Sequence, residues 1–143
     1  MGASWTRRRS SRRRLEAGLG LETWNSDELD VVEAAQDATG GRGVDLVVDT
    51  SGAEGAISSG VNMLRRRGRL CAVGVSGRES IGFPWDAALF RAIDLRFGSS
   101  YTSWDAAHSL MRSGAVDVEP LTTVCALEEG EDAFRAVEKQ RGC

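Results

Sequence analysis

Small and hydroxyl residues follow three short apolar runs of the sequence, and residues of these types could bind a flat ligand. The three groups are Asp49-Thr50-Ser51-Gly52, Gly74-Val75-Ser76-Gly77 and Gly98-Ser99-Ser100. Small side chains let a ligand approach the backbone, whose N–H and C=O groups can then fix its orientation. The same residue types are common in ordinary turns. The residues alone therefore leave both a nucleotide site and plain turn chemistry open.

The titratable residues form no pattern that predicts catalysis or metal binding. His108 is far in sequence from any cluster of thiols or acids, so we interpret it as a partly buried or surface histidine. Three aspartates have no base at a meaningful spacing: Asp49, Asp94 and Asp105. The cysteines lack the paired spacing of a zinc site and the density of a disulfide scaffold: Cys71, Cys125 and Cys143. We assign no catalytic residue, and we expect reduced thiols and a cytoplasmic location.

The apolar runs predict parallel strands that would position the three groups. The run from Val44 to Val48 is nearly continuous, which is typical of a central strand buried on both faces. A second run, from Leu70 to Val73, starts about 25 residues later, as a strand, helix, strand crossover requires. A third run extends from Ile93 to Phe97, and a short strand is expected at residues 121–125.

Helical periodicity fills the intervals between these strands. Asn25 and Glu28 have the spacing of a capping box, which predicts a helix that starts there and ends at Gly40-Gly41. A second helix spans residues 53–64, and the cations at residues 65–67 would lie at its negative end. Ser103 should cap a helix over residues 104–112. The last helix, over residues 128–139, should turn three apolar residues inward: Ala133, Phe134 and Val137.

The alternation of strands and helices predicts an α/β fold, a doubly wound parallel sheet of partial Rossmann-like type with flanking helices. Such sheets bind ligands at the carboxyl ends of their strands, where the three groups of small residues fall. The 143 residues suffice for about one domain. No apolar run approaches the roughly 18 residues that a membrane span needs, so we expect no membrane partner.

The first 14 residues differ from the rest in charge. They contain six of the 18 basic residues and no acid, so residues 15–143 carry 12 basic and 21 acidic groups. A nucleic-acid-binding arm, an organelle-targeting peptide and a disordered or wrongly started terminus all fit this composition. We favour a disordered leader over residues 1–14 and expect no nucleic-acid partner, because the acidic remainder of the chain would oppose phosphate binding.

Several blocks, taken in order, carry a resemblance to a known family. These blocks are "TGGRGVDLVVDTSG", "LRRRGRLCAVGVSG" and "LRFGSSYTSWDAAHSLMRSGAVDVEPLTTVCALEEGEDAFRAV". Residues 15–143 resemble the second half of the cofactor domain of zinc-type, medium-chain alcohol dehydrogenases, most closely the sorbitol (polyol) and threonine dehydrogenase-like branch. The resemblance implies a partial NAD(P)-binding Rossmann domain of an oxidoreductase that acts on CH–OH groups.

The resemblance also implies which residues contact the cofactor, NAD or NADP. The fourth family strand ends near the nicotinamide ribose, the fifth near the carboxamide and the sixth beside the ring. The matching residues here are Asp49, Thr50, Ser51 and Gly52, then Val73, Gly74 and Val75, and finally Phe97, Gly98 and Ser99. Exposed main-chain groups and small side chains suit these roles.

The segment from Glu79 to Trp85 resembles the family's dimer strand, which would make the chain a homo-oligomer by extending its sheet into a partner. A surface loop in which Phe83 and Trp85 pack back on the domain is an equal alternative.

The chain departs from the family in the residues that it lacks. It contains no Gly-x-Gly-x-x-Gly turn, no strand pattern around Trp5, and none of the ligands that hold zinc in the family. We therefore expect a fragment of a zinc-dependent NAD(P)-dependent alcohol or polyol dehydrogenase, weak in cofactor binding and inactive alone. The alternative is a stand-alone nucleotide-binding or protein-interaction module that completes another chain. Arginines in the leader could bind a 2′-phosphate if a strand preceded them.

Overall fold

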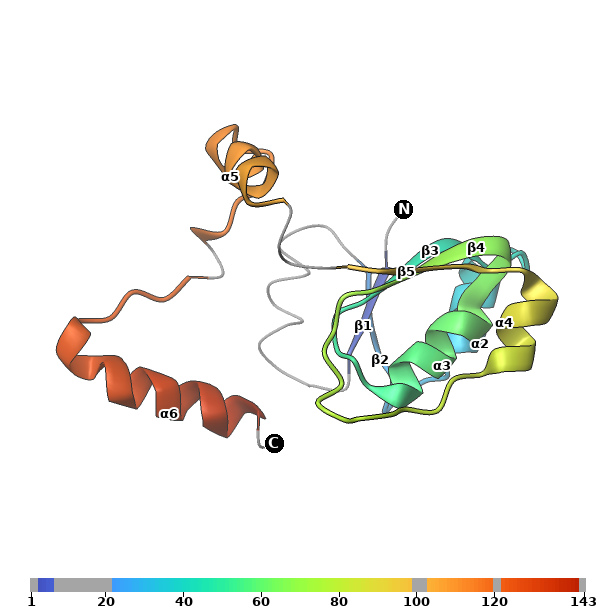
Figure 1. Cartoon of the computed structure of the whole chain (residues 1–143), viewed down its shortest axis with the longest axis horizontal. Helices are drawn as coiled ribbons and strands as arrows, with labels where there is room; N and C mark the ends of the chain where they lie inside the picture. Colours follow the sequence, from blue (N-terminus) through green and yellow to red (C-terminus); the bar gives the residue numbers. More distant parts are fainter. Residues whose placement is uncertain (1–2, 7–21, 99–102, 120–121, 142–143) are drawn as a thin grey trace. The chain divides into compact units, whose positions relative to one another are not determined.

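A computed structural model describes residues 3–6, 22–98, 103–119 and 122–141 of the chain. The chain divides into two compact units, Met1–Trp104 and Asp105–Cys143. Strands and helices alternate through the first unit (Figure 1). The described part of the second unit contains helices joined by irregular segments.

A three-stranded parallel sheet organises the first unit. Its strands are β3 (Val44–Asp49), β4 (Leu64–Ala72) and β5 (Asp94–Phe97), and β4 lies between the other two. Helices α3 (Glu54–Met63) and α4 (Trp85–Arg91) pack on one face of this sheet (Figure 1). The predicted α/β class, the strands at the three apolar runs and their parallel crossover are confirmed.

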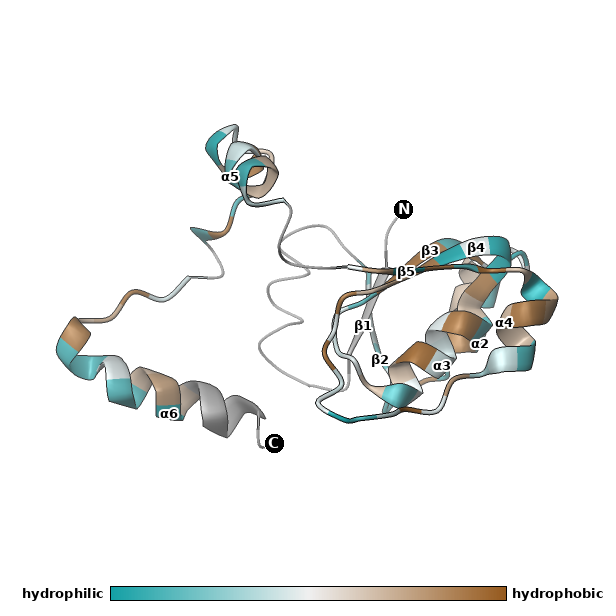
Figure 2. Ribbon diagram, in the orientation of Figure 1, coloured by the Kyte–Doolittle hydropathy of each residue, from teal (hydrophilic) through white to brown (hydrophobic). Residues whose placement is uncertain are grey.

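The core lies between this helical layer and the sheet. Val47 and Leu70 point from the sheet toward Ile57 and Val61 of α3 and Ala88 of α4. Figure 2 shows the corresponding brown, apolar surface of α3. Helix α3 can approach the sheet closely because Gly60 has no side chain. An added Cβ at Gly60 would lie only 3.0 Å from the Val47 side chain.

The expectation that β3 is central and buried on both faces is wrong. In the described sheet β3 is an edge strand, and the side chains of Leu46 and Val48 are 53% and 48% exposed. Side chains alternate between the two faces of a strand, and only the Val47 face meets the helices. A continuous apolar run therefore did not indicate two covered faces.

A second parallel pair precedes this sheet. Strand β1 (Ala3–Thr6) pairs with β2 (Glu22–Asn25), with Trp5 opposite Trp24. The prediction that no strand forms around Trp5 is therefore wrong. The hydrogen bonds of β1 come from its pairing with β2, and the sequence of the four β1 residues does not reveal that pairing. Arginines 7–14 of the predicted leader lie outside the described residues.

Helix α2 (Val31–Ala38) begins later than its predicted cap. Asp30 is the N-cap, and its side chain accepts hydrogen bonds from the N–H groups of Val32 and Glu33. Asn25 instead ends β2 and shapes a turn, because its carbonyl accepts the N–H groups of Glu28 and Leu29. The helix ends as predicted, with Gly40 and Gly41 at positive φ.

The arginines after α3 belong to β4. The helix ends at Met63, and β4 begins at Leu64. Val44 pairs with Leu64 and Leu46 with Arg69, so residues 65–68 form an irregularity in the strand. Arg67 has a φ of 57° there. Residues 65–67 therefore lie in the irregular part of β4 and not in the last turn of the helix, where they were predicted to interact.

The segment from Glu79 to Trp85 forms a loop that leads into α4. Phe83 packs against the core, and its ring meets the Trp85 ring edge to face with centroids 6.5 Å apart. Trp85 itself is largely exposed. The pairing of this segment with a partner subunit stays a prediction.

The second unit contains α6 (Gly130–Arg141), a short 3₁₀ helix η2 (Leu127–Glu129) and all but the first residue of α5 (Trp104–Arg112). The helix predicted over residues 104–112 is confirmed, and Gly114 follows it at a φ of 72°. Residues 122–126 form no strand, and Leu121 lies outside the described part. Phe134, expected to face inward, is exposed.

Candidate functional site

The carboxyl ends of β3, β4 and β5 lie side by side. The carbonyl of Asp49 accepts the N–H groups of Val73 and Gly74 at 2.8 and 3.0 Å. The N–H of Gly98 donates to the carbonyl of Ala72 at 2.9 Å. These bonds place the three predicted groups of small residues along one rim of the sheet, which we call the carboxyl rim.

The side chain of Asp49 shapes the first turn of this rim. One carboxylate oxygen accepts the N–H and hydroxyl of Ser51 at 3.1 and 2.7 Å, and the other accepts the N–H of Gly52 at 2.9 Å. Asp49 is buried, whereas Thr50 and Ser51 are exposed. The carboxylate is thus committed to the turn, and Thr50 is the exposed hydroxyl residue beside it.

Two glycines allow the first and second turns to touch through their backbones. A Cβ at Gly74 would lie 2.1 Å from the N atom of Gly52. A Cβ at Gly52 would lie 2.5 Å from the carbonyl carbon of Val75, and Gly52 has a φ of 67°. No larger side chain fits at either position without displacing backbone.

The outer surface of the carboxyl rim is apolar. Val75 and Phe97 are 88% and 78% exposed, and Val73, which follows β4 directly, is 50% exposed. Gly98 packs against the Val73 side chain. The rim therefore presents three exposed apolar side chains beside small residues, an arrangement suited to one face of a planar ligand.

Nine of the ten predicted site residues lie on this rim, and Ser99 is outside the described part. What the sequence reading missed is that Asp49 acts as an internal acceptor. Aspartate commonly accepts a hydrogen bond from the backbone two residues later, so the Asp-Thr-Ser spacing carried this signal.

The described residues do not supply a metal site. No group of three His, Cys, Asp or Glu side chains comes together in residues 3–6, 22–98, 103–119 and 122–141. His108 is exposed on α5. Within the same part of the chain, no helix is long and apolar enough to span a membrane.

The family model of zinc-binding dehydrogenases matches residues 4–113. The chain belongs to the zinc-binding dehydrogenase family. The match begins within the predicted leader and covers residues 4–6 of β1, so the family pattern starts before residue 15, where the resemblance was expected to begin.

A curated protein resembles the chain in sequence, and a solved structure resembles it in fold. D-xylulose reductase A of Aspergillus oryzae is 39% identical over 105 residues, which cover 71% of this chain and 29% of that protein. The structure of the alcohol dehydrogenase TADH from Thermus sp. ATN1 superposes with a TM-score of 0.87 at 26% identity, covering 97% of this chain and 42% of that one.

A zinc-binding dehydrogenase from Sinorhizobium meliloti 1021, described as putative and bound to NADP, superposes with a TM-score of 0.72 at 23% identity, covering 84% of this chain and 36% of that one. This last likeness concerns the fold. The chain therefore spans about a third of the length of the relatives that it matches.

Proposed function

We propose that the chain forms the nicotinamide-side wall of the NAD(P) site in a zinc-dependent alcohol or polyol dehydrogenase. The carboxyl rim is the observation that carries this proposal, because it joins three neighbouring strand ends at the place where doubly wound sheets bind ligands. Membership of the zinc-binding dehydrogenase family supports the same reading.

The residues of the rim suit the nicotinamide end of the cofactor. Val73, Val75 and Phe97 can contact the ring through exposed apolar surface. The exposed residue Thr50 offers a hydroxyl that can bind a ribose oxygen, and the buried Asp49 holds the turn that follows it. When bound, the nicotinamide supplies the acceptor for a hydride from the substrate's carbinol carbon.

Zinc does not fit the described residues, because they offer no group of ligands. We therefore derive no step through the metal, and we propose that the isolated chain does not oxidise alcohols. An absorbance rise at the wavelength of the reduced cofactor, when the chain is given a polyol, NAD and zinc, would contradict this part of the proposal.

Cofactor binding can be tested by titrating the 15N-labelled chain with NADH and NADPH and following amide shifts by NMR, a method that detects weak complexes. We expect shifts at Thr50, Gly74 and Gly98. Val75→Asp should weaken binding at least about tenfold, because a carboxylate replaces an exposed apolar contact. Leu89→Asp is the matched control, since Leu89 is an exposed apolar residue of α4 outside the rim. Shifts absent from the rim, or equal losses in both variants, would refute the cofactor wall.

A second candidate function is a module that completes another chain. Among the described residues β3 is an edge strand, which favours this function because an unpaired strand edge can accept a strand from a partner. Protection of the outward-facing β3 amides from exchange, gained only on mixing with such a partner, would distinguish this function from cofactor binding.

A further inference from the structure

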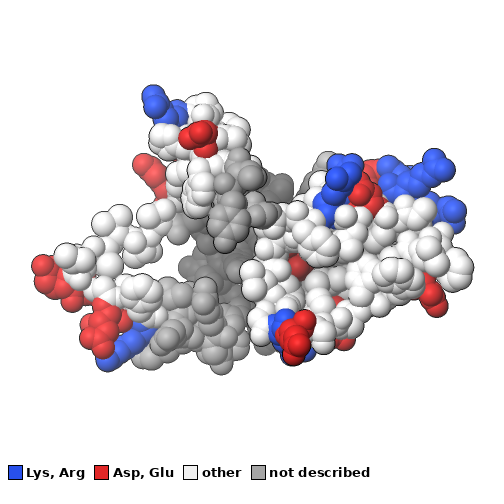
Figure 3. Space-filling model, viewed as in Figure 1, with Lys and Arg blue, Asp and Glu red and all other residues white. Residues whose placement is uncertain are grey.

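The amino ends of the same three strands carry a concentrated positive charge. Residues 15–143 contain 12 basic residues, and seven of them gather here. We call them the arginine surface: Arg42, Arg65, Arg66, Arg67, Arg69, Arg91 and Arg96. Two carboxylates, Asp45 and Asp94, lie among them, which leaves five positive charges in excess. Figure 3 shows blue side chains with red between them over this part of the first unit.

Ion pairs hold much of the arginine surface in place. Asp45 binds Arg42 and Arg65, and Asp94 binds Arg69 at 2.9 Å and Arg96 at 3.0 Å. These guanidinium groups keep the pKa values of both carboxyls below their usual range, chiefly through hydrogen bonds from Arg42 to Asp45 and from Arg69 to Asp94. The arginines are therefore preorganised, so less side-chain entropy is lost when they meet a further anion.

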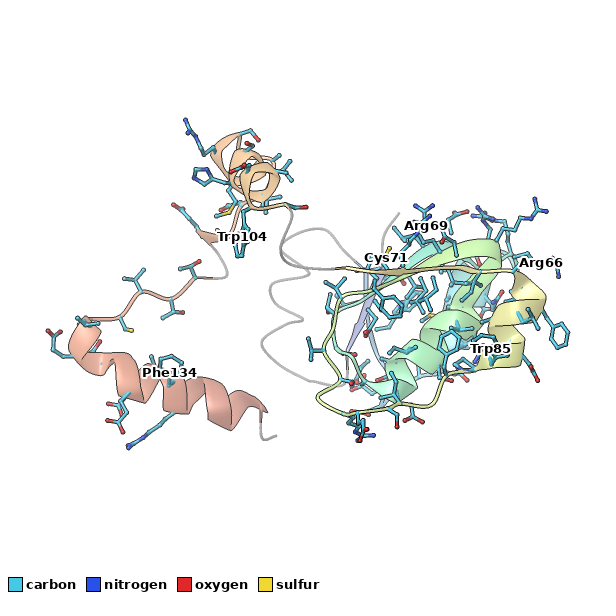
Figure 4. All side chains as sticks on the ribbon, in the orientation of Figure 1. Arg66, Arg69, Cys71, Trp85, Trp104 and Phe134 are labelled. Carbon is cyan, nitrogen blue, oxygen red and sulfur yellow. The ribbon has the colours of Figure 1, made fainter. Side chains whose placement is uncertain are left out.

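Exposed apolar residues border the arginine surface. Arg66 donates to the carbonyl of Phe90 at 2.9 Å, and Phe90 and its neighbour Leu89 are exposed on α4. Figure 4 shows Arg66 and Arg69 on the same side of the first unit. Arginine beside aromatic surface is the composition of protein interfaces, whereas a phosphate backbone would gain nothing from Leu89. The border favours a protein partner over a nucleic acid.

The chain itself carries an exposed surface of opposite charge. Four acidic residues occur within five positions in η2 and the first turn of α6, and we call them the acidic segment: Glu128, Glu129, Glu131 and Asp132. Leu127, which starts this stretch, is 92% exposed and could meet Leu89 or Phe90 of a partner.

We propose that the arginine surface of one copy binds the acidic segment of a second copy, so that the chain self-associates through charge complementarity. A two-fold arrangement repeats the contact reciprocally, so each dimer contains it twice. A single exposed ion pair contributes little to the free energy of binding. Several preorganised charges beside an apolar border that loses its water on binding contribute more together. The contact uses no residue of the carboxyl rim.

The test is sedimentation velocity of the full chain at about 0.05 M and 0.5 M NaCl, since exposed charges are screened within roughly a few ångströms at high salt. We expect a dimer at low salt that dissociates at high salt. Arg66→Glu/Arg67→Glu should raise the dissociation constant at least about tenfold, and Glu128→Arg/Asp132→Arg should do the same. An equimolar mixture of the two variants should restore the dimer, because each altered surface then meets its new complement.

Two further variants keep the result interpretable. Arg78→Glu/Arg112→Glu makes the same change of net charge outside the arginine surface and should leave the dimer intact. Circular dichroism would reveal whether loss of the Arg66 bond to Phe90 unfolds the first unit. In that case Arg67→Glu alone, which keeps this bond, tests whether the arginine surface is needed for the dimer.

Three outcomes would overturn the proposal. In the first, the wild type stays monomeric at low salt. In the second, the wild-type dimer persists at high salt and both charge-reversed variants still dimerise, as expected if the dimer forms through the Glu79 to Trp85 segment. A monomeric wild type that binds a single-stranded oligonucleotide through the arginines would assign the surface to nucleic acid instead. All three are independent of cofactor binding at the rim.

Discussion

The two ends of the β3–β4–β5 sheet are stabilised by different interactions. At the carboxyl rim, a buried carboxylate and main-chain carbonyls hold the turns, and two glycines bring backbones into contact. At the amino ends, exposed arginines and aspartates pair in water. The backbone conformation at the rim is thus fixed by buried interactions that salt does not weaken. The charged residues at the other end can be replaced with only a small loss of folding stability.

The largest effect is expected at the contact of the two turns. Gly74→Ala should destabilise the chain by about 3 kcal/mol or prevent folding, because the added Cβ would overlap the backbone of Gly52. Thermal unfolding followed by circular dichroism measures the effect. Gly77→Ala is the control, since Gly77 has a φ of 67° but nothing within 4 Å of the added atom. It should cost only about 1 kcal/mol, and equal losses would show that the backbone contact does not matter.

The next effect should come from the buried carboxylate. Asp49→Asn removes one acceptor and leaves the N–H of Ser51 or Gly52 without a partner, which should cost about 2 kcal/mol in urea unfolding. Asp86→Asn, an exposed change in the first turn of α4, should be close to neutral. If the two substitutions had similar effects, the rim would not depend on Asp49.

The smallest effect is expected among the ion pairs. Asp45→Asn should lower the melting temperature slightly at neutral pH and low salt, and the difference should disappear at high salt. Asp45 has a lowered pKa in the fold, so its contribution is present above about pH 4, the usual range of an unfolded aspartate, and is lost as the pH falls. Melting curves of the wild type and the variant should therefore converge in acid. A difference in melting temperature that increases as the pH falls would contradict a stabilising role of the ionised Asp45.

Much of the sheet and its ligand-binding rim could be predicted from the sequence. The apolar runs located β3, the second half of β4 and β5, and the small residues after them marked the strand ends. These features are local, because strand periodicity and turn residues act over a few positions. The same is true of α3, which its apolar spacing located, and of α5, which Ser103 and Gly114 bracket.

The features that were missed have different causes, and two of them, β1 and the one-sided burial of β3, depend on partners distant in the sequence. Strand β1 needs β2, and the cap of α2 shifted from Asn25 to Asp30 because the chain first turns after β2. Helix α4 was not predicted, although Trp85, Ala88 and Leu89 have helical spacing. The segment that leads into it was interpreted as a dimer strand or a surface loop. The one-sided burial of β3 depends on which helices cover the sheet.

The carbonyl of Asp49 serves two amides of the neighbouring turn, and this sharing has a dynamic consequence. Neither turn can swing outward without breaking both bonds, so the amides of Val73 and Gly74 should exchange with solvent in a single cooperative opening. Motion on one side of the rim is thereby transmitted to the other, and the two turns respond to a bound molecule as one element.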